Sequence, residues 1–149
     1  MARRAEENKR GEPIDPTQVV ETTLRVRYAE TDQMGVVYYA NFLVWFEVAR
    51  GAFCRAREIN YSQMEQEGLG LPLLEAHCRY LRPARYDEEI TLRTWVAECR
   101  RSLLKMQYEV KRGEELLATG ETLQMLVELA TNKPCRFPPE LASRFLLEE

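Results

Sequence analysis

The sequence predicts an α+β domain in which an antiparallel sheet of five strands wraps around one long central helix. Two observations predict this fold. Segment 42–56 places bulky apolar residues at helical spacing. After residue 72, apolar and polar residues alternate in four successive segments, as they do in strands. Short turns between these segments imply antiparallel neighbours, and a sheet that covers a helix buries the apolar face of each.

Composition limits the class of protein. The chain has 149 residues, of which 45% are hydrophobic, and its net charge is −3, so we expect one globular domain and no nucleic-acid partner. No apolar run approaches the roughly 20 residues that span a bilayer. The basic N-terminus lacks the apolar stretch of a secretory signal, so we expect no membrane span and a cytoplasmic location.

Cysteine and histidine usage argues against a metal site. No Cys-x-x-Cys pair occurs, and the chain has one histidine, so zinc-ligand spacing is missing. We interpret the four cysteines as reduced residues packed like small apolar side chains: Cys54, Cys78, Cys99 and Cys135. His77 lies in an alternating segment, which favours a structural role. We therefore expect neither a metal nor a redox cofactor.

The elements follow in order. Residues 1–20 are charged and lack apolar periodicity, so we interpret them as a mobile tail ahead of a domain over 21–149. Alternation predicts a strand at 24–28. The long helix then carries its apolar face at Phe42, Trp45, Phe46, Ala49, Phe53 and Ala56, and Asn41 suits its first turn.

The second half of the chain reads almost entirely as strands. A short polar helix is expected over 61–67 and is followed by a glycine breaker at 68–70. Strands are then expected over 73–81, 90–98, 103–111 and 116–129. Pro139 suits the start of a short terminal helix over 140–147.

The segment 27–42 holds the candidate chemistry. Asp32 is one of three aspartates and stands between a strand end and the start of the apolar helix. Gly35 permits a tight turn. The loop residues Val36, Val37, Tyr38 and Tyr39 would exclude water from around a carboxylate. The helix start offers free amides that could polarise a carbonyl oxygen. The alternative is that Asp32 only caps a turn.

The motif Thr31-Asp32-x-x-Gly35-Val36-Val37-Tyr38-Tyr39-Ala40-Asn41-Phe42, followed by Glu47 and Ala49-Arg50, resembles the signature of the hotdog-fold thioesterases. The branch is that of 4-hydroxybenzoyl-CoA thioesterase and the Tol–Pal-associated acyl-CoA thioesterases, and the likeness covers roughly residues 22–137. The resemblance implies that Asp32 is the catalytic aspartate. It also implies that the Tyr39 N–H holds the thioester carbonyl. Many acyl-CoA members have histidine at this position, so Tyr39 leaves Asp32 as the one strong catalytic candidate.

We also expect Gly35, Val36, Val37, Tyr38 and Asn41 to contact substrate. The resemblance further implies that basic residues in the expected turn between the third and fourth strands, Arg100 and Arg101, contact coenzyme A phosphates, to which guanidinium groups are suited. Lys105 is a weaker third candidate. The alternatives are a solvated charged turn, or phosphate binding by Arg79, Arg82 and Arg85. Glu47 and Arg50 stand three residues apart, which favours a structural ion pair or a subunit contact.

The implied activity is hydrolysis of an acyl-CoA, with Asp32 as nucleophile or general base. The resemblance also implies a dimer with a continuous sheet that pairs again into a tetramer, with active sites between subunits. One rival function is a non-catalytic acyl-CoA-binding module. The other is a hydratase or dehydratase, which would need an acid–base partner for Asp32. The identity of the acyl group does not follow from the sequence.

Overall fold

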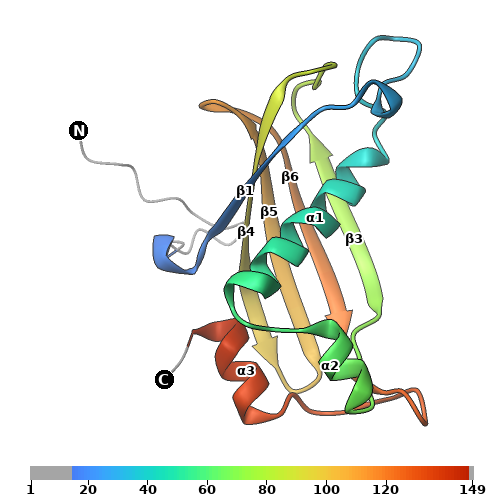
Figure 1. Ribbon diagram of the computed structural model, residues 1–149, viewed down its shortest axis with the longest axis vertical. Helices are drawn as coiled ribbons and strands as arrows, with labels where there is room; N and C mark the ends of the chain where they lie inside the picture. The colour runs from blue at the N-terminus through green and yellow to red at the C-terminus, as the bar shows by residue number, and fades with distance from the viewer. Residues whose placement is uncertain (1–14, 148–149) are drawn as a thin grey trace.

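The computed structural model describes residues 15–147, in which five antiparallel strands form one curved sheet around a central helix (Figure 1). The strand order is β1-β4-β5-β6-β3. The strands are β1 (Val20–Arg25), β3 (Leu73–Tyr80), β4 (Glu89–Arg100), β5 (Leu103–Arg112) and β6 (Glu115–Met125). The expected α+β class is confirmed. Most of the expected N-terminal tail, residues 1–14, lies outside the described residues.

The remaining elements cover the ends of this sheet. A second, three-stranded sheet has the order β2-β7-β8. Its strands are β2 (Leu69–Gly70), β7 (Val127–Glu128) and β8 (Lys133–Pro134). The α-helices are α1 (Asn41–Ala56), α2 (Tyr61–Gln66) and α3 (Pro139–Leu146), and two 3-10 turns are η1 (Pro16–Gln18) and η2 (Tyr28–Glu30). All three helices expected from the sequence are present, with bounds shifted by one residue or so at most ends.

Helix α1 supplies the centre of the core because one of its faces is bulky and apolar. The expected residues of this face are buried, except for Ala56, which is exposed in the last turn. Phe46 stacks on Tyr108 of β5 with ring centroids 4.4 Å apart. A Cβ on Gly120 of β6 would lie 2.2 Å from the Phe46 ring, so this glycine lets the ring reach the sheet.

Two strands differ from the sequence-based expectation. The first strand was expected at 24–28 but runs over Val20–Arg25, because the chain turns after Val26 and residues 28–30 form η2. The last long strand was expected to continue to residue 129 but leaves β6 at Met125. At this break the Leu126 N–H donates to the Ser102 carbonyl, and the chain then joins the small sheet as β7. A strand-like sequence pattern that continues past Met125 cannot reveal such a change of partner.

One face of α1 and one edge of the sheet carry exposed apolar side chains. Leu43, Val44 and Val48 of α1 are 41–51% exposed. Strand β3 is an edge of the main sheet, and its Leu73 and Leu74 are about half exposed. In Figure 1, α1 crosses in front of the sheet, with no element in front of it. The fold therefore leaves an apolar surface uncovered in the single chain.

Candidate active site

The loop between η2 and α1 folds back on itself and presents Asp32. Thr31 and Val37 form an isolated antiparallel bridge. The Asp32 N–H donates to the Val36 carbonyl at 2.9 Å, and the Gly35 N–H donates to the Asp32 carbonyl at 3.0 Å. Gly35 has φ +76°, a conformation that glycine adopts without steric cost. The role expected of Gly35 in a tight turn is thus present.

The Asp32 side chain is half-buried at the mouth of this turn. Its Oδ1 accepts the Met34 N–H at 2.8 Å, so the carboxylate also closes the turn, as the structural alternative expected. Among residues 15–147, Oδ2 has no hydrogen-bond partner. The pKa of Tyr38 is raised, mainly by its contact with the Tyr39 hydroxyl and to a smaller extent by the Asp32 charge. One carboxylate oxygen therefore remains available near the tyrosines that precede α1.

Two backbone amides are free where α1 begins. The N–H groups of Asn41, Phe42 and Leu43 donate to carbonyls three residues earlier. Within residues 15–147, the N–H groups of Tyr39 and Ala40 have no hydrogen-bond acceptor. The sequence-based expectation of free amides is therefore met by these two, and they are the donors that a carbonyl oxygen could use.

Glu30 fixes this loop to the core, and sequence reasoning missed it. The residue is 5% exposed, and Oε2 accepts the Trp45 indole N–H at 2.8 Å while Oε1 accepts the Arg27 N–H at 2.9 Å. Its carbonyl accepts the Tyr38 N–H and the Asn41 Nδ2, each at 2.9 Å. A tryptophan on the apolar face of the helix was the available signal, because a buried indole N–H needs an acceptor.

The apolar residues of the loop are less buried than we expected. Val37 is in the core at 5% exposed, and Val36 is half-buried, but Tyr38 and Tyr39 are 45% and 61% exposed. Within residues 15–147, these tyrosines are therefore too exposed to exclude water from Asp32. A hollow of about 610 Å³ lies at the other end of α1, lined by residues between 51 and 63.

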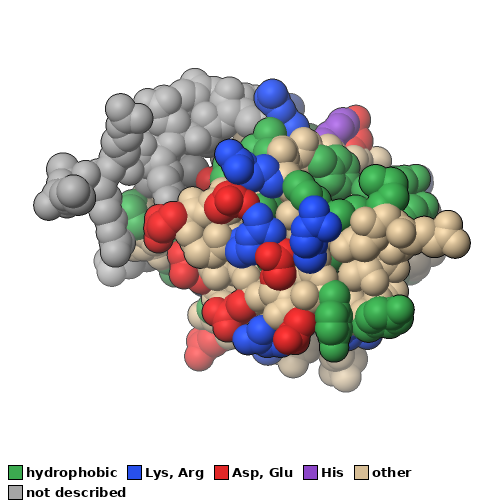
Figure 2. Space-filling model, turned by 90° about the horizontal axis from the view of Figure 1, so that it is seen from above, with side chains coloured by type: hydrophobic (Ala, Val, Ile, Leu, Met, Phe, Trp, Pro, Cys, Tyr) green, Lys and Arg blue, Asp and Glu red, His purple; other side chains and the backbone are tan. Residues whose placement is uncertain are grey.

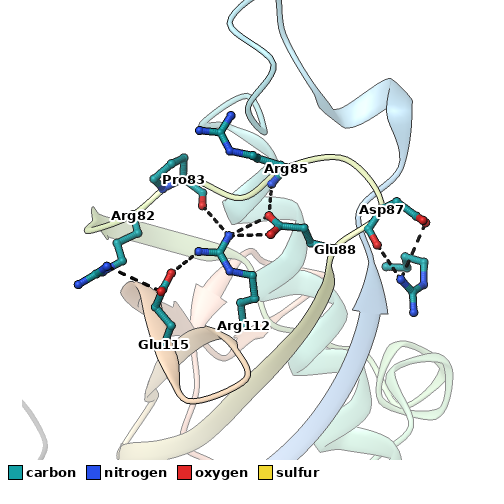
Figure 3. Close-up of polar contacts among 8 residues, drawn as sticks. Arg82, Pro83, Arg85, Asp87, Glu88, Arg112 and Glu115 are labelled. Atoms are coloured by element: carbon teal, nitrogen blue, oxygen red, sulfur yellow. Dashed lines mark hydrogen bonds and ion pairs between the residues drawn. The ribbon is translucent and has the colours of Figure 1, made fainter.

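A second loop, 81–88, supports the Asp32 loop from the side. The Ala84 carbonyl accepts the Val37 N–H at 2.8 Å, and Ala84 is fully buried. Arg112 holds this second loop by donating to the Pro83 carbonyl at 3.2 Å and to both oxygens of Glu88 at 2.8 and 2.9 Å (Figure 3). The guanidinium also pairs with Glu115. Arg112 therefore fixes the loop 81–88, and this loop in turn contacts the loop of Asp32.

The structure does not bring Arg100 and Arg101 to Asp32 within one chain. The Asp32 loop follows β1, which ends beside the first residue of β4, whereas Arg100 is the last residue of β4. A strand of 12 residues spans roughly 35 Å, so the two regions lie at opposite ends of the sheet (Figure 1). Arg100 is exposed and pairs with Glu98 at 2.5 Å.

The end that carries Asp32 has its own basic side chains. Seen from this end, Lys and Arg side chains alternate with Asp and Glu in the middle, and apolar side chains gather on the right, the side of the Asp32 loop (Figure 2). Arg82 pairs with Glu115 at 3.7 Å, whereas the Arg85 guanidinium forms no ion pair with residues 15–147 and extends away from the other side chains in Figure 3. Arg82 and Arg85 are thus nearer to Asp32 than the turn at Arg100.

The other candidates occupy structural positions. Arg50 is buried and pairs with the exposed Glu47, while donating to the Tyr108 hydroxyl at 3.2 Å, so the expected ion pair is confirmed with arginine as the buried member. His77 is exposed on β3 with Glu75 at 3.7 Å. The four cysteines are thiols and form no disulfide. Residues 15–147 hold no group of side chains arranged to bind a metal, and no helix in that range could cross a bilayer.

A curved five-stranded antiparallel sheet wrapped around one long helix is the architecture of the hotdog class of domain. Residues 26–145 match the family model described as the Thioesterase-like superfamily, and the chain belongs to this family. The family and fold expected from the motif are therefore confirmed.

Relatives and solved structures agree with this assignment. YneP of Bacillus subtilis is 35% identical over 115 residues, which cover 76% of this chain and 83% of that protein. The acyl-CoA thioesterase YbgC of Haemophilus influenzae is 29% identical over 125 residues, or 82% and 90% of the two chains. The structure of DHNA-CoA thioesterase from Staphylococcus aureus superposes with a TM-score of 0.81 at 32% identity, covering 87% of this chain and 89% of that one.

Proposed function

We propose that the chain hydrolyses an acyl-CoA thioester to a free acid and coenzyme A. The observation that carries this proposal is a half-buried carboxylate with one unpaired oxygen on the loop that leads into two free amides at the start of α1. The names of the relatives, acyl-CoA and DHNA-CoA thioesterases, support the substrate class. Asp32 and Tyr39 are the proposed catalytic residues.

The thioester carbonyl accepts a hydrogen bond from the Tyr39 N–H ahead of α1. Asp32 then acts in one of two ways. As a nucleophile, its oxygen bonds to the carbonyl carbon, the C–S bond breaks, and water hydrolyses the resulting anhydride. As a general base, it takes a proton from the water that attacks the carbonyl. In both cases the thiolate leaves and is protonated. Base assistance and oxyanion stabilisation together lower the barrier by about 5 to 8 kcal/mol.

A thiol-release assay over short, long and aromatic acyl-CoAs tests this proposal. Asp32→Asn should lower kcat at least about a hundredfold without unfolding the protein, because the amide oxygen can still accept the Met34 N–H. Asp87→Asn is the matched control, since Asp87 lies at φ +66° in the neighbouring loop and asparagine tolerates that conformation.

Two outcomes would contradict the proposal. If wild type binds acyl-CoA but releases no thiol, the chain is a binding module. If Asp32→Asn keeps full activity, Asp32 has no part in the chemistry. After turnover in ¹⁸O-labelled water, a label in the Asp32 carboxylate would identify it as the nucleophile, because a general base acquires no oxygen from water.

We also propose that the chain works as a homo-oligomer. The supporting observations are the exposed Leu43, Val44 and Val48 on α1 and the free edge strand β3 with Leu73 and Leu74. Pairing through this edge would give a dimer with a continuous sheet, and two dimers would make a tetramer. Covering α1 would also dry the loop of Tyr38 and Tyr39. Sedimentation at micromolar concentration tests this, and a monomer under assay conditions would contradict it.

Two further assignments belong to the same proposal. Gly35, Val36, Val37, Tyr38 and Asn41 shape the acyl site around Asp32, and Arg100 and Arg101 bind the coenzyme A phosphates of a site in a neighbouring subunit. The proposed compartment is the cytoplasm, and the four cysteines, which form no disulfide, support it.

A further inference from the structure

Tyr80, the last residue of edge strand β3, is joined to the start of α1. Its hydroxyl donates to the Tyr39 carbonyl at 2.8 Å. Its ring meets Phe42 edge-on with centroids 5.1 Å apart, and meets Tyr39 in the same way at 6.4 Å. Because these two ring contacts fix the tyrosine plane, the hydroxyl is aimed at one carbonyl oxygen.

The Tyr39 carbonyl and the Ala40 N–H belong to one peptide unit. The unit is planar and trans, so its oxygen and its N–H point in opposite directions. Holding the oxygen therefore sets the direction of the Ala40 N–H. This oxygen also accepts the Phe42 N–H at 3.2 Å. Each hydrogen bond that the oxygen accepts polarises the peptide and makes the Ala40 N–H a stronger donor.

The Ala40 N–H has no acceptor among residues 15–147, and it lies next to the free Tyr39 N–H. This peptide is oriented and polarised through its carbonyl, while its N–H is unused. The N–H is therefore available to an external hydrogen-bond acceptor. In the proposed hydrolysis, that acceptor is the oxygen of the thioester, which gains negative charge as the tetrahedral centre forms.

We propose that Tyr80 is a positioning residue for catalysis, which orients and polarises the Ala40 amide so that this N–H joins the Tyr39 N–H in binding the oxyanion. The inference rests on the proposed thioesterase function. It adds a second donor to the site, and it assigns to the edge strand of the sheet a role in the chemistry at the helix start.

The protonation of Tyr80 is compatible with this role. Loss of hydration, followed by its contact with Cys78, raises the pKa of the Tyr80 hydroxyl above the ordinary tyrosine value. The hydroxyl therefore remains a donor at neutral and moderately alkaline pH. It acts through the peptide rather than by transferring a proton to the substrate.

Tyr80→Phe tests the proposal, because it removes the hydroxyl and keeps the ring against Phe42 and Tyr39. Kcat should fall about tenfold, since one oxyanion donor is weakened rather than removed, and KM should change less than about twofold. The shape of the pH–rate profile should not change. Tyr86→Phe is the matched control: Tyr86 is exposed, packs on Tyr28 at 5.7 Å, and should give wild-type kinetics.

The amide resonance of Ala40 gives a readout that does not depend on activity. In Tyr80→Phe its ¹⁵N–¹H signal should move upfield, because the Tyr39 carbonyl no longer accepts a hydrogen bond from the hydroxyl of residue 80. The signals of distant strands should stay in place. An unmoved Ala40 signal would overturn the proposal. If Tyr80→Phe does not fold, 3-fluorotyrosine at position 80 provides a stronger donor, and kcat should then be equal to or above wild type; a fall would overturn the proposal.

The two proposals fail in different ways. If wild type releases no thiol from any acyl-CoA, the proposed function fails and the role of Tyr80 with it. If wild type is active, Asp32→Asn is inactive, and Tyr80→Phe retains the wild-type kcat, only the role of Tyr80 is overturned.

Discussion

The carboxylate of Glu30 accepts the indole N–H of Trp45 at 2.8 Å, and this bond joins the loop of Asp32 to the central helix. Trp45 is 1% exposed, so its position is set by the core. Glu30 also fixes its neighbours relative to the core, because its backbone carbonyl accepts hydrogen bonds from the Tyr38 N–H and the Asn41 Nδ2. The candidate catalytic aspartate, two residues further on, is thereby placed by the packing of α1.

Glu30→Gln should destabilise the fold. The carboxylate accepts from both Trp45 and Arg27, whereas an amide offers one acceptor atom and turns its NH₂ towards the other donor. The expected loss in free energy of unfolding is about 1–3 kcal/mol by urea titration. Kcat should fall as well, because the Asp32 loop loosens. Glu89→Gln, at an exposed pair with Arg25, is the control and should change stability by less than about 0.5 kcal/mol. Equal midpoints for the two variants would contradict the anchoring role of Glu30.

Gly120→Ala should destabilise the core. The added Cβ would lie 2.2 Å from the Phe46 ring and 3.1 Å from the His77 carbonyl, and the ring cannot retreat because it stacks on Tyr108. The expected cost is about 1–3 kcal/mol, measured by thermal or urea unfolding. Gly51→Ala is the matched comparison, since its Cβ would meet only Arg55 Nη1 at 3.4 Å inside α1. That change should be neutral or stabilise by up to about 1 kcal/mol. A neutral Gly120→Ala would show that α1 can move off the sheet.

Stability should fall in alkaline solution because of buried tyrosines. Burial is the main cause that raises the pKa of Tyr61 and of Tyr108 above the ordinary value. The folded state therefore keeps protons that the unfolded state loses, so this stabilisation is complete below about pH 10 and is lost as pH rises towards the folded-state pKa. Urea midpoints between about pH 8 and pH 11 measure the loss. Tyr61→Phe should reduce the slope in this range, and the exposed Tyr86→Phe should not. Identical slopes would exclude Tyr61 as a source.

Replacing both Arg100 and Arg101 by alanine should raise KM for an acyl-CoA about tenfold or more, because charge-assisted bonds to phosphate are lost. KM for an acyl N-acetylcysteamine thioester, which has no phosphate, should not change. Replacing both Arg82 and Arg85 is the comparison, and it should leave both KM values unchanged. The opposite pattern would assign phosphate binding to the loop 81–88.

Mixing subunits tests whether these arginines serve another chain. Asp32→Asn subunits retain both arginines, and the double arginine variant retains Asp32. If sites form between subunits, mixed oligomers should recover activity at low acyl-CoA concentration, because some sites combine both intact parts. No recovery would mean that Asp32 and the phosphate-binding residues belong to the same chain.

The sequence was sufficient to predict the architecture and the family. The spacing of Phe42, Trp45, Phe46 and Phe53 predicts a helix with one buried face, and the alternating segments predict the strands, because burial of one face imposes the period of each element. The motif from Thr31 to Phe42 is local, so its resemblance identifies the family and the loop of Asp32. Chain continuity also places Gly35 and the start of α1 beside that aspartate.

Only the tertiary structure decided which distant residues support the site and which lie far from it. Glu30 and Trp45 meet through packing, and Tyr80 reaches Tyr39 across 41 positions because β3 ends beside the start of α1. The sequence offers Arg100 and Arg101 as candidates for phosphate binding. The structure shows that a 12-residue strand separates their turn from Asp32 in the same chain. Such relationships depend on the register and direction of whole elements, which no local pattern of residues encodes.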